Sequence, residues 1–163
     1  MTIVADASSL ILLSKIRLLE KLVERTKIIV PKKVYGEVVR GKEKGREDAF
    51  LVERLVKEKR IKMRQANEKL KKEIERTFNL HEGENEALAT ALENRHTILT
   101  DDKKCFTAAR TLKLNFITSL DVVAALYKKG RIDKRKAMQS LDELLEYGWY
   151  KRSLIEKYRR EIV

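Results

Sequence analysis

The stretch TIVAD (residues 2–6) decides the fold, because a β-branched, apolar run ends directly in an acid. A second stretch, TILTDD (residues 97–102), repeats the pattern and ends in two adjacent aspartates. Short apolar runs of this kind predict buried strands. Acids at the carboxyl ends of parallel strands lie where ligands of open α/β sheets bind. Because buried carboxylates cost desolvation free energy unless they are paired or bind a cation, the pattern favours a divalent-metal site.

Further apolar runs alternate with segments that have the apolar spacing of amphipathic helices. The expected additional strands are residues 27–30, 61–63 and 115–117. The expected helices are one that Ser8 or Ser9 caps, then 18–23, 31–38, 43–59, 67–78, 83–94, 103–112, 119–129, 133–147 and 151–163, the last three separated by Gly130 and Gly148. The alternation predicts an α/β fold with a mostly parallel sheet of about five strands, covered by helices on both faces in three layers.

The length of 163 residues predicts one domain. We expect this domain to span residues 1–130 and the helical extension, residues 131–163, to pack on it. The expected helix at 43–59 would use Phe50, Leu51, Leu55 and Val56 as its apolar face.

The chain is basic, with a formal net charge of +12, and 38% of its residues are charged. A basic surface attracts polyanions, and nucleic acid is a better candidate than an acidic membrane. Ion-pair networks of a heat-adapted protein explain the abundant charges equally well, and a melting midpoint in the ordinary mesophilic range would contradict a thermophilic source. Cys105 is the only cysteine, which excludes an intrachain disulfide and favours the cytoplasm. No apolar run is long enough to predict a membrane span.

The charges are segregated along the sequence. Residues 79–102 contain six acids and one base, a formal −5, whereas residues 103–163 contain fifteen bases and seven acids, a formal +8. An acidic region beside a basic one suits an enzyme that binds a cation and acts on a polyanion. Proteins that do not bind nucleic acid also show such segregation.

Helical geometry separates the acids of the expected helix 83–94. Glu84 lies on the same side of this helix as its apolar stripe, because Ala87, Leu88 and Ala91 follow it by three, four and seven residues. The remaining glutamates of this region, Glu82, Glu86 and Glu93, are expected on the solvent side. An inward-facing acid in a first helical turn favours a metal ligand, and the alternative is a helix-capping carboxylate.

Ordinary structural roles also remain open for the other acids. Glu37 would lie at the margin of an apolar helix face, and Asp6 would cap the helix that follows it. Asp101 and Asp102 are adjacent, so their side chains should diverge and only one needs to bind a cation. The isolated His81 and His96 are expected in loops or at the surface, because neither has His or Cys partners at ligand spacing.

The order of these motifs resembles the PIN domain family of metal-dependent ribonucleases, in particular its VapC-like prokaryotic members. The resemblance extends from residue 2 to about residue 118 and loosely to Gly130. The motifs that carry it are VADASSLI (4–11), VP (30–31), VYGEV (34–38), GENEALA (83–89) and ILTDD (98–102) followed by Phe106.

The resemblance implies that Asp6, Glu37, Glu84 and Asp102 are the catalytic acids. The same acids together with Asp101 are the expected metal ligands, and the Thr-x-Asp spacing favours Asp102 over its neighbour. Ser8 and Thr100 are the expected hydrogen-bonding residues behind these ligands. Two positions depart from the commoner pattern: a glutamate stands at position 84 instead of an aspartate, and Cys105 stands where an acid is frequent.

Oxygen ligands favour Mg²⁺ or Mn²⁺, and the expected reaction is hydrolysis of RNA phosphodiester bonds. Lys103, Lys104 and Arg110 would hold the RNA backbone, and the alternative for each is a solvated helix surface. The resemblance also implies an antitoxin protein as partner, with this chain as the toxin, and a homodimer. Three other functions remain open: a phosphorelay receiver, which the late position of the acid pair disfavours, a non-catalytic RNA-binding or processing-complex module, and a structure-specific DNA nuclease.

Overall fold

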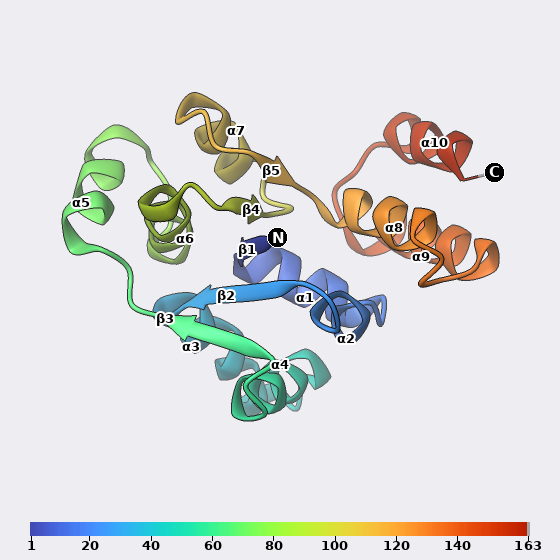
Figure 1. Cartoon of the computed structure of the whole chain (residues 1–163), viewed down its shortest axis with the longest axis horizontal. Coiled ribbons are helices and arrows are strands. Elements are labelled where there is room, and N and C mark those ends of the chain that lie inside the picture. Colours follow the sequence, from blue (N-terminus) through green and yellow to red (C-terminus); the bar gives the residue numbers. More distant parts are fainter. Residues whose placement is uncertain (163) are drawn as a thin grey trace.

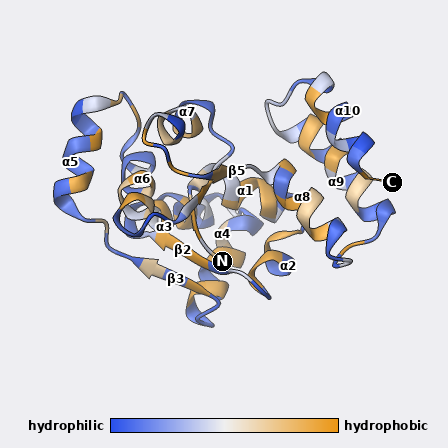
Figure 2. Ribbon diagram, turned by 45° about the horizontal axis from the view of Figure 1, so that its top comes forward, coloured by the Kyte–Doolittle hydropathy of each residue, from blue (hydrophilic) through white to orange (hydrophobic). Residues whose placement is uncertain are grey.

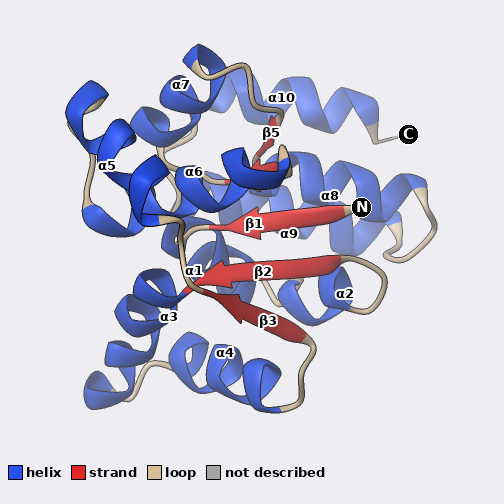
Figure 3. Ribbon diagram, turned by 60° about the vertical axis from the view of Figure 1, so that its left-hand side comes forward, coloured by secondary structure: helices blue, strands red, loops and turns tan. Residues whose placement is uncertain are grey.

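The computed structural model describes residues 1–162, which form a five-stranded parallel sheet between layers of helices (Figure 1). The strand order is β3-β2-β1-β4-β5, and every pairing is parallel. Figure 3 shows the first three strands side by side and pointing in the same direction. The strands are β1 (Thr2–Ala5), β2 (Lys27–Pro31), β3 (Ile61–Arg64), β4 (Thr97–Leu99) and β5 (Phe116–Ile117). The predicted α/β class with five parallel strands is therefore confirmed.

Ten α-helices and one 3₁₀ segment connect the strands of the described chain or follow them. Those before β4 are α1 (Ala7–Lys15), α2 (Leu19–Val23), α3 (Lys32–Val39), η1 (Arg40–Lys44), α4 (Glu47–Lys57), α5 (Glu68–Thr77) and α6 (Glu82–Asn94). Those after it are α7 (Lys103–Thr111), α8 (Ser119–Lys128), α9 (Lys134–Tyr147) and α10 (Arg152–Glu161). Each expected element is present, with its ends shifted by a few residues, except that 43–59 divides into η1 and α4, and residue 163 lies outside the described residues.

The order of the strands fixes a crevice at one edge of the sheet. The chain moves from β1 outward through β2 to β3, and then returns to the other side of β1 to form β4 and β5. Because parallel crossovers are right-handed, this reversal places the β1–β3 connections on one face and the later connections on the other. The carboxyl ends of β1 and β4 flank the point of reversal, which is where open α/β sheets bind their ligands.

The core forms because the central strands are apolar on both faces. Val4, Ala5, Val30, Ile98 and Leu99 are completely buried, as expected for strands that helices cover on both sides. Figure 2 shows the contrast with α5, in which most residues are hydrophilic and only Ile74 is buried. No helix of residues 1–162 is long and apolar enough to cross a membrane.

The apolar face predicted for residues 43–59 is wrong in part. The helix begins only at Glu47, and it buries Ala49, Val52 and Leu55. Phe50 is 49% exposed and lies near the ammonium group of Lys42 instead of in the core. The prediction failed because it followed the larger apolar side chains Phe50 and Leu51, whereas the inward stripe of α4 runs through Ala49, Val52 and Leu55. Gly45, with φ 69°, ends η1 before this helix begins.

The predicted solvent position of Glu86 is also wrong. Glu82 and Glu93 are exposed as expected, but Glu86 is only 5% exposed. Helix α5 packs against α6 and places the ammonium group of Lys71 3.5 Å from the Glu86 carboxylate. Periodicity within one helix identifies its apolar stripe, but it does not show that a second polar helix covers another side.

The last two helices pack against the rest of the molecule. Helix α9 contacts α8, and α10 contacts both of them (Figure 1). Tyr158 of α10 donates a hydrogen bond to Asp121 of α8 at 2.6 Å. Gly130 has φ 67° where α8 ends, and Gly148 follows α9 directly, so both predicted helix breaks are present. The division into a domain at 1–130 and an extension at 131–163 stays a prediction.

Candidate active site

Asp6 lies in the crevice, at the junction of β1 and α1. Its Oδ1 accepts hydrogen bonds from the Ser9 amide at 3.0 Å and from the Ser8 hydroxyl at 2.7 Å. Asp6 therefore caps α1, and the expected capping by Ser8 or Ser9 is wrong because both residues lie inside the first turn. The Thr100 hydroxyl donates to Oδ2. A carboxylate oxygen has two lone pairs, so Oδ2 retains one for a further ligand. The capping role and a role in binding a cation are therefore compatible.

Thr100 and Ser8 join the ends of the two central strands. The Asp102 amide donates to the Thr100 hydroxyl at 3.0 Å, so Thr100 contacts both predicted acids. The Asp101 amide donates to the Ser8 hydroxyl, also at 3.0 Å. Ser8 and Thr100 therefore hold the backbone after β4 against Asp6, and their role behind metal ligands stays a prediction.

Asp102 and Asp101 point in different directions, as expected for adjacent residues at a strand end. Asp102 caps α7 by accepting a hydrogen bond from the Cys105 amide at 2.9 Å. Asp101 is 1% exposed, and its two oxygens accept hydrogen bonds from the amide and hydroxyl of Ser119 and from the hydroxyl of Tyr150. Asp101 therefore ties β4 to α8 and to the C-terminal segment, and only Asp102 of the pair faces the cleft.

Glu37 reaches the crevice from α3, and Gly83 of α6 provides the space for it. A Cβ atom at position 83 would lie 2.6 Å and 2.7 Å from the two carboxylate oxygens of Glu37. Any side chain at position 83 would thus occupy the position of this carboxylate. The contact explains why a glycine is needed in the first turn of a helix, where glycine has a poor intrinsic propensity.

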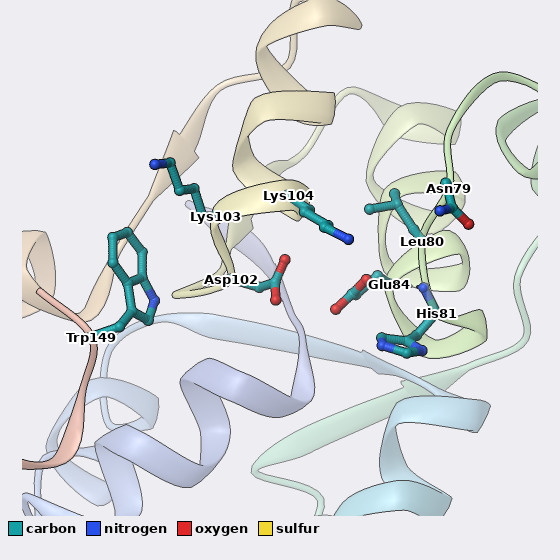
Figure 4. A pocket seen from close by; sticks show the side chains of 8 residues that line it. All are labelled: Asn79, Leu80, His81, Glu84, Asp102, Lys103, Lys104 and Trp149. Atoms are coloured by element: carbon teal, nitrogen blue, oxygen red, sulfur yellow. Dashed lines mark hydrogen bonds between the residues drawn. The ribbon is translucent and has the colours of Figure 1, made fainter.

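Glu84 follows Gly83 and is half-buried. One of its oxygens, Oε2, accepts a hydrogen bond from the His81 amide at 3.1 Å, so the capping alternative is correct. The same carboxylate lines the cleft, and its other oxygen has no role in the cap (Figure 4). Glu84 therefore caps α6 and also lines the cleft, and its role as a metal ligand stays a prediction.

Two adjoining cavities form the cleft, and both include His81 and Glu84. One has a volume of about 440 Å³, and Asp6, Glu37 and Gly83 line it. The other has a volume of about 520 Å³, and Asp102 lies in its wall. Figure 4 shows Asp102 facing Glu84 across this second cavity. The structure therefore brings the four predicted catalytic acids to two adjoining cavities that share Glu84, which together are called the cleft.

Burial disfavours the ionised forms of Asp6, Glu37 and Glu84, and repulsion by neighbouring acids adds to the effect at Glu84. Burial raises the pKa of Asp6 from 3.8 to about 6, although hydrogen bonds from Thr100, Ser9 and Ser8 oppose the shift. The pKa of Glu84 is raised by burial first and then by the charges of Asp102 and Asp6. Burial also raises the pKa of Glu37, although Lys33 and Arg40 partly offset the effect. A bound cation would relieve this repulsion.

The donor set fits a hard divalent cation. Carboxylate oxygens from four separate elements suit Mg²⁺ or Mn²⁺. The absence of a side chain at Gly83 leaves space for one of these carboxylates, that of Glu37. Within residues 1–162, no three His, Cys, Asp or Glu side chains already form a closed ligand group. The acids therefore share the cleft without converging on one point, and binding an ion would require side-chain rotations.

Basic residues occupy two sides of the cleft. Lys103 and Lys104 are exposed at the start of α7 and line the cavity beside Asp102, as predicted (Figure 4). Arg110 is in the last turn of α7, where its guanidinium lies 5.5 Å from the ring centroid of Phe116, and it does not line this cavity. Lys33 and Arg40 line the other cavity near Glu37, and no sequence motif pointed to them.

Sequence reasoning missed three further residues of the cleft. His81 is exposed at the surface, as expected, but its place in the lining of both cavities was not predicted. Gly83 was not expected to have a role, although its place directly before Glu84 could have suggested close packing. Trp149 forms part of the cavity wall beside Asp102, and its being the only tryptophan in the chain was the available signal.

Known proteins resemble this chain in sequence and in fold. A family model described as DUF3368, PIN domain, matches residues 2–162, whereas no curated protein matches. The fold is similar to that of a PilT N-terminus domain protein from the hyperthermophilic archaeon Sulfolobus solfataricus P2, with TM-score 0.53 and 18% identity over 78% of this chain and 94% of that one. VapBC-1 from nontypeable Haemophilus influenzae gives TM-score 0.56 and 17% identity over 72% of this chain and 98% of that one. VapBC2 from Rickettsia felis, bound to a DNA fragment from the promoter, gives TM-score 0.48 and 15% identity over 72% of this chain and 98% of that one.

At identities this low, the first two structures support the fold alone. The family model covers nearly the whole sequence, including the GENEALA and ILTDD motifs that supply Glu84 and Asp102. Together with the acid-lined crevice between β1 and β4, this match shows that the chain belongs to the PIN domain family.

Proposed function

We propose that this protein is a Mg²⁺- or Mn²⁺-dependent endoribonuclease. One observation carries the proposal: Asp6, Glu37, Glu84 and Asp102 come from four different elements and line one cleft at the reversal point of the sheet. Membership of the PIN family, whose members are generally nucleases, supports the same reaction class.

The four acids would hold the cation, which supplies a nucleophilic water at neutral pH and neutralises charge on the phosphate. Thr100 and Ser8 keep Asp6 and the backbone after β4 in register, so the Asp6 carboxylate and the backbone of Asp102 are positioned before substrate binds. Lys103 and Lys104 would hold the RNA backbone beside Asp102 through charge attraction to its phosphates.

The same proposal extends to the biological setting. The VapC-like sequence pattern and the fold shared with VapBC-1 favour a toxin that an antitoxin protein restrains. Such a protein would act on RNA in the cytoplasm, and a homodimer is the assembly that we expect. Co-purification with a product of an adjacent gene and the mass of the assembly in solution would test these parts.

The central experiment compares cleavage of RNA and DNA substrates with Mn²⁺ and with EDTA. We expect Asp6→Asn and Glu84→Gln to abolish Mn²⁺-dependent RNA cleavage while circular dichroism shows an intact fold. Glu93→Gln is the matched control, because Glu93 lies on α6 but is exposed at the far end from the cleft. Full activity of both site variants would refute the proposal, and cleavage of DNA alone would reassign the substrate.

A further inference from the structure

Trp149 is held in a fixed position between α9 and α10. Its indole N–H donates a hydrogen bond to the backbone carbonyl of Asp101, the residue directly before Asp102. Its ring lies 4.6 Å from the ring of Tyr150 and 6.0 Å from that of Phe106, measured between centroids. Two aromatic neighbours and one hydrogen bond therefore fix both the place and the orientation of the indole.

The rest of the indole is open to the cleft. Trp149 is 47% exposed, and it lines the 520 Å³ cavity together with Glu84, Asp102, Lys103 and Lys104. In Figure 4 it lies on the opposite side of Asp102 from Glu84. An aromatic surface of this size is usually buried, and the polar N–H group of Trp149 is already satisfied. The exposed part of the ring therefore serves no evident purpose in packing.

We propose that Trp149 is a stacking platform for one unpaired base of the RNA next to the scissile phosphate. The inference deepens and rests on the proposed ribonuclease function. Aromatic side chains beside cationic groups are the usual means of binding single-stranded nucleic acid, because the ring stacks on a base and the cations hold the backbone. Here both components border the acid that would bind the metal. The preferred substrate is then single-stranded RNA, because a base within a duplex cannot stack on the indole.

Fluorescence gives a direct binding test, because Trp149 is the only tryptophan of the chain. A short single-stranded RNA should quench its emission in the wild-type protein with EDTA and in Asp6→Asn with Mn²⁺. A duplex of the same sequence should quench it much less. Absence of quenching by an RNA whose binding is shown by an independent method would overturn the inference.

Cleavage kinetics separate stacking from a structural role. Removing a stacked base contact changes affinity by about 5- to 150-fold. We therefore expect Trp149→Leu to raise KM by a factor in this range while kcat changes little, because a binding contact acts on substrate and transition state alike. Trp149→Phe, which keeps a ring but lacks the N–H group, should lose less. A fall in kcat with unchanged KM would instead indicate that Trp149 only positions the Asp101–Asp102 segment.

A matched control and modified substrates complete the test. Tyr147→Leu removes an aromatic ring with 48% exposure from the end of α9, outside the cavity wall, and it should leave KM unchanged. An abasic site scanned along the RNA should weaken binding to the wild-type protein most at one position next to the cleavage site. The same abasic site should cause no further loss of affinity in Trp149→Leu. An equal loss of affinity in both proteins would overturn the inference. If no RNA is cleaved but quenching and the abasic effect persist, the ribonuclease proposal fails and the base-binding role of Trp149 stands.

Discussion

Substitution of Gly83 by alanine should separate activity from stability. The added Cβ would lie 2.6 Å from one carboxylate oxygen of Glu37, where ordinary contacts begin near 3.4 Å. Glu37 must therefore shift by at least about 0.8 Å, estimated from contact distances. The shift is easily accommodated, because the obstructing atoms are at the far end of a flexible, half-buried side chain.

Gly83→Ala should keep or slightly raise the stability of the fold, whereas it should lower the rate of RNA cleavage. Alanine is favoured over glycine by about 0.5–1 kcal/mol within a helix, so the free energy of unfolding should stay equal or rise slightly. A displacement of about 1 Å in a catalytic group can cost on the order of 100-fold in rate, which corresponds to about 2.7 kcal/mol of barrier. We therefore expect Gly83→Ala to reduce kcat/KM for RNA by about two orders of magnitude with no loss of thermal stability.

The assay is Mn²⁺-dependent cleavage of an RNA oligonucleotide together with thermal unfolding. Gly36→Ala is the matched control, since Gly36 also lies in a helix and a Cβ there would meet no atom within 4 Å. This variant should remain fully active. In a Glu37→Ala background, Gly83→Ala should cause no further loss, because the carboxylate that it displaces is already absent. Wild-type activity of Gly83→Ala, or additive losses in the double variant, would refute the placement of Glu37.

Two further predictions concern the charges of the cleft. Burial raises the folded-state pKa of Asp6 from 3.8 to about 6, so its contribution to stability is fully present below pH 3.8 and is lost as the pH rises to about 6. In the metal-free protein this loss of unfolding free energy is at most about 3 kcal/mol. Denaturant unfolding across this pH range should show the loss, and Asp6→Asn should remove it. A wild-type stability that does not change with pH would contradict the prediction. Replacing both Lys103 and Lys104 by methionine should lower the slope of log Kd for single-stranded RNA against log salt by about 1.4, or about 0.7 for each lost phosphate contact. Arg110→Met should leave the slope unchanged, because its guanidinium lies against Phe116 and outside the cleft; an equal effect of all three residues would indicate non-specific charge attraction.

The fold was predictable because local and global signals agree along the strands. The runs that end in Asp6 and Asp101 are apolar or β-branched at every position, which is characteristic of strands covered on both faces. The signals failed where one element covers another. Glu86 has the helical phase of a surface residue, and only the packing of α5 against α6 buries it beside Lys71. That contact joins two polar helices, so no apolar pattern announces it.

The cleft was predictable only as far as backbone position determines it. Asp6 and Asp102 follow β1 and β4, which pair directly, so their proximity follows from topology alone. Glu37 and Gly83 come from helices on different connections, and their contact depends on how α3 and α6 meet at the sheet edge. Trp149 is 47 residues beyond Asp102, and nothing local indicates that the link between α9 and α10 returns to the cleft.

The adjacent pair Asp101 and Asp102 shows why residue type alone could not complete the site. Both residues follow the same strand and are the same acid, so either satisfies a motif that requires a carboxylate there. The pleat turns one side chain toward α8, where Ser119 and Tyr150 donate hydrogen bonds to it, and leaves the other at the cleft. The buried Asp101 carboxylate accepts a hydrogen bond from the Tyr150 hydroxyl, and the indole N–H of the neighbouring Trp149 donates one to the Asp101 backbone carbonyl. The C-terminal helices are therefore physically joined to the strand end that presents Asp102, so they help to determine where the fourth acid lies.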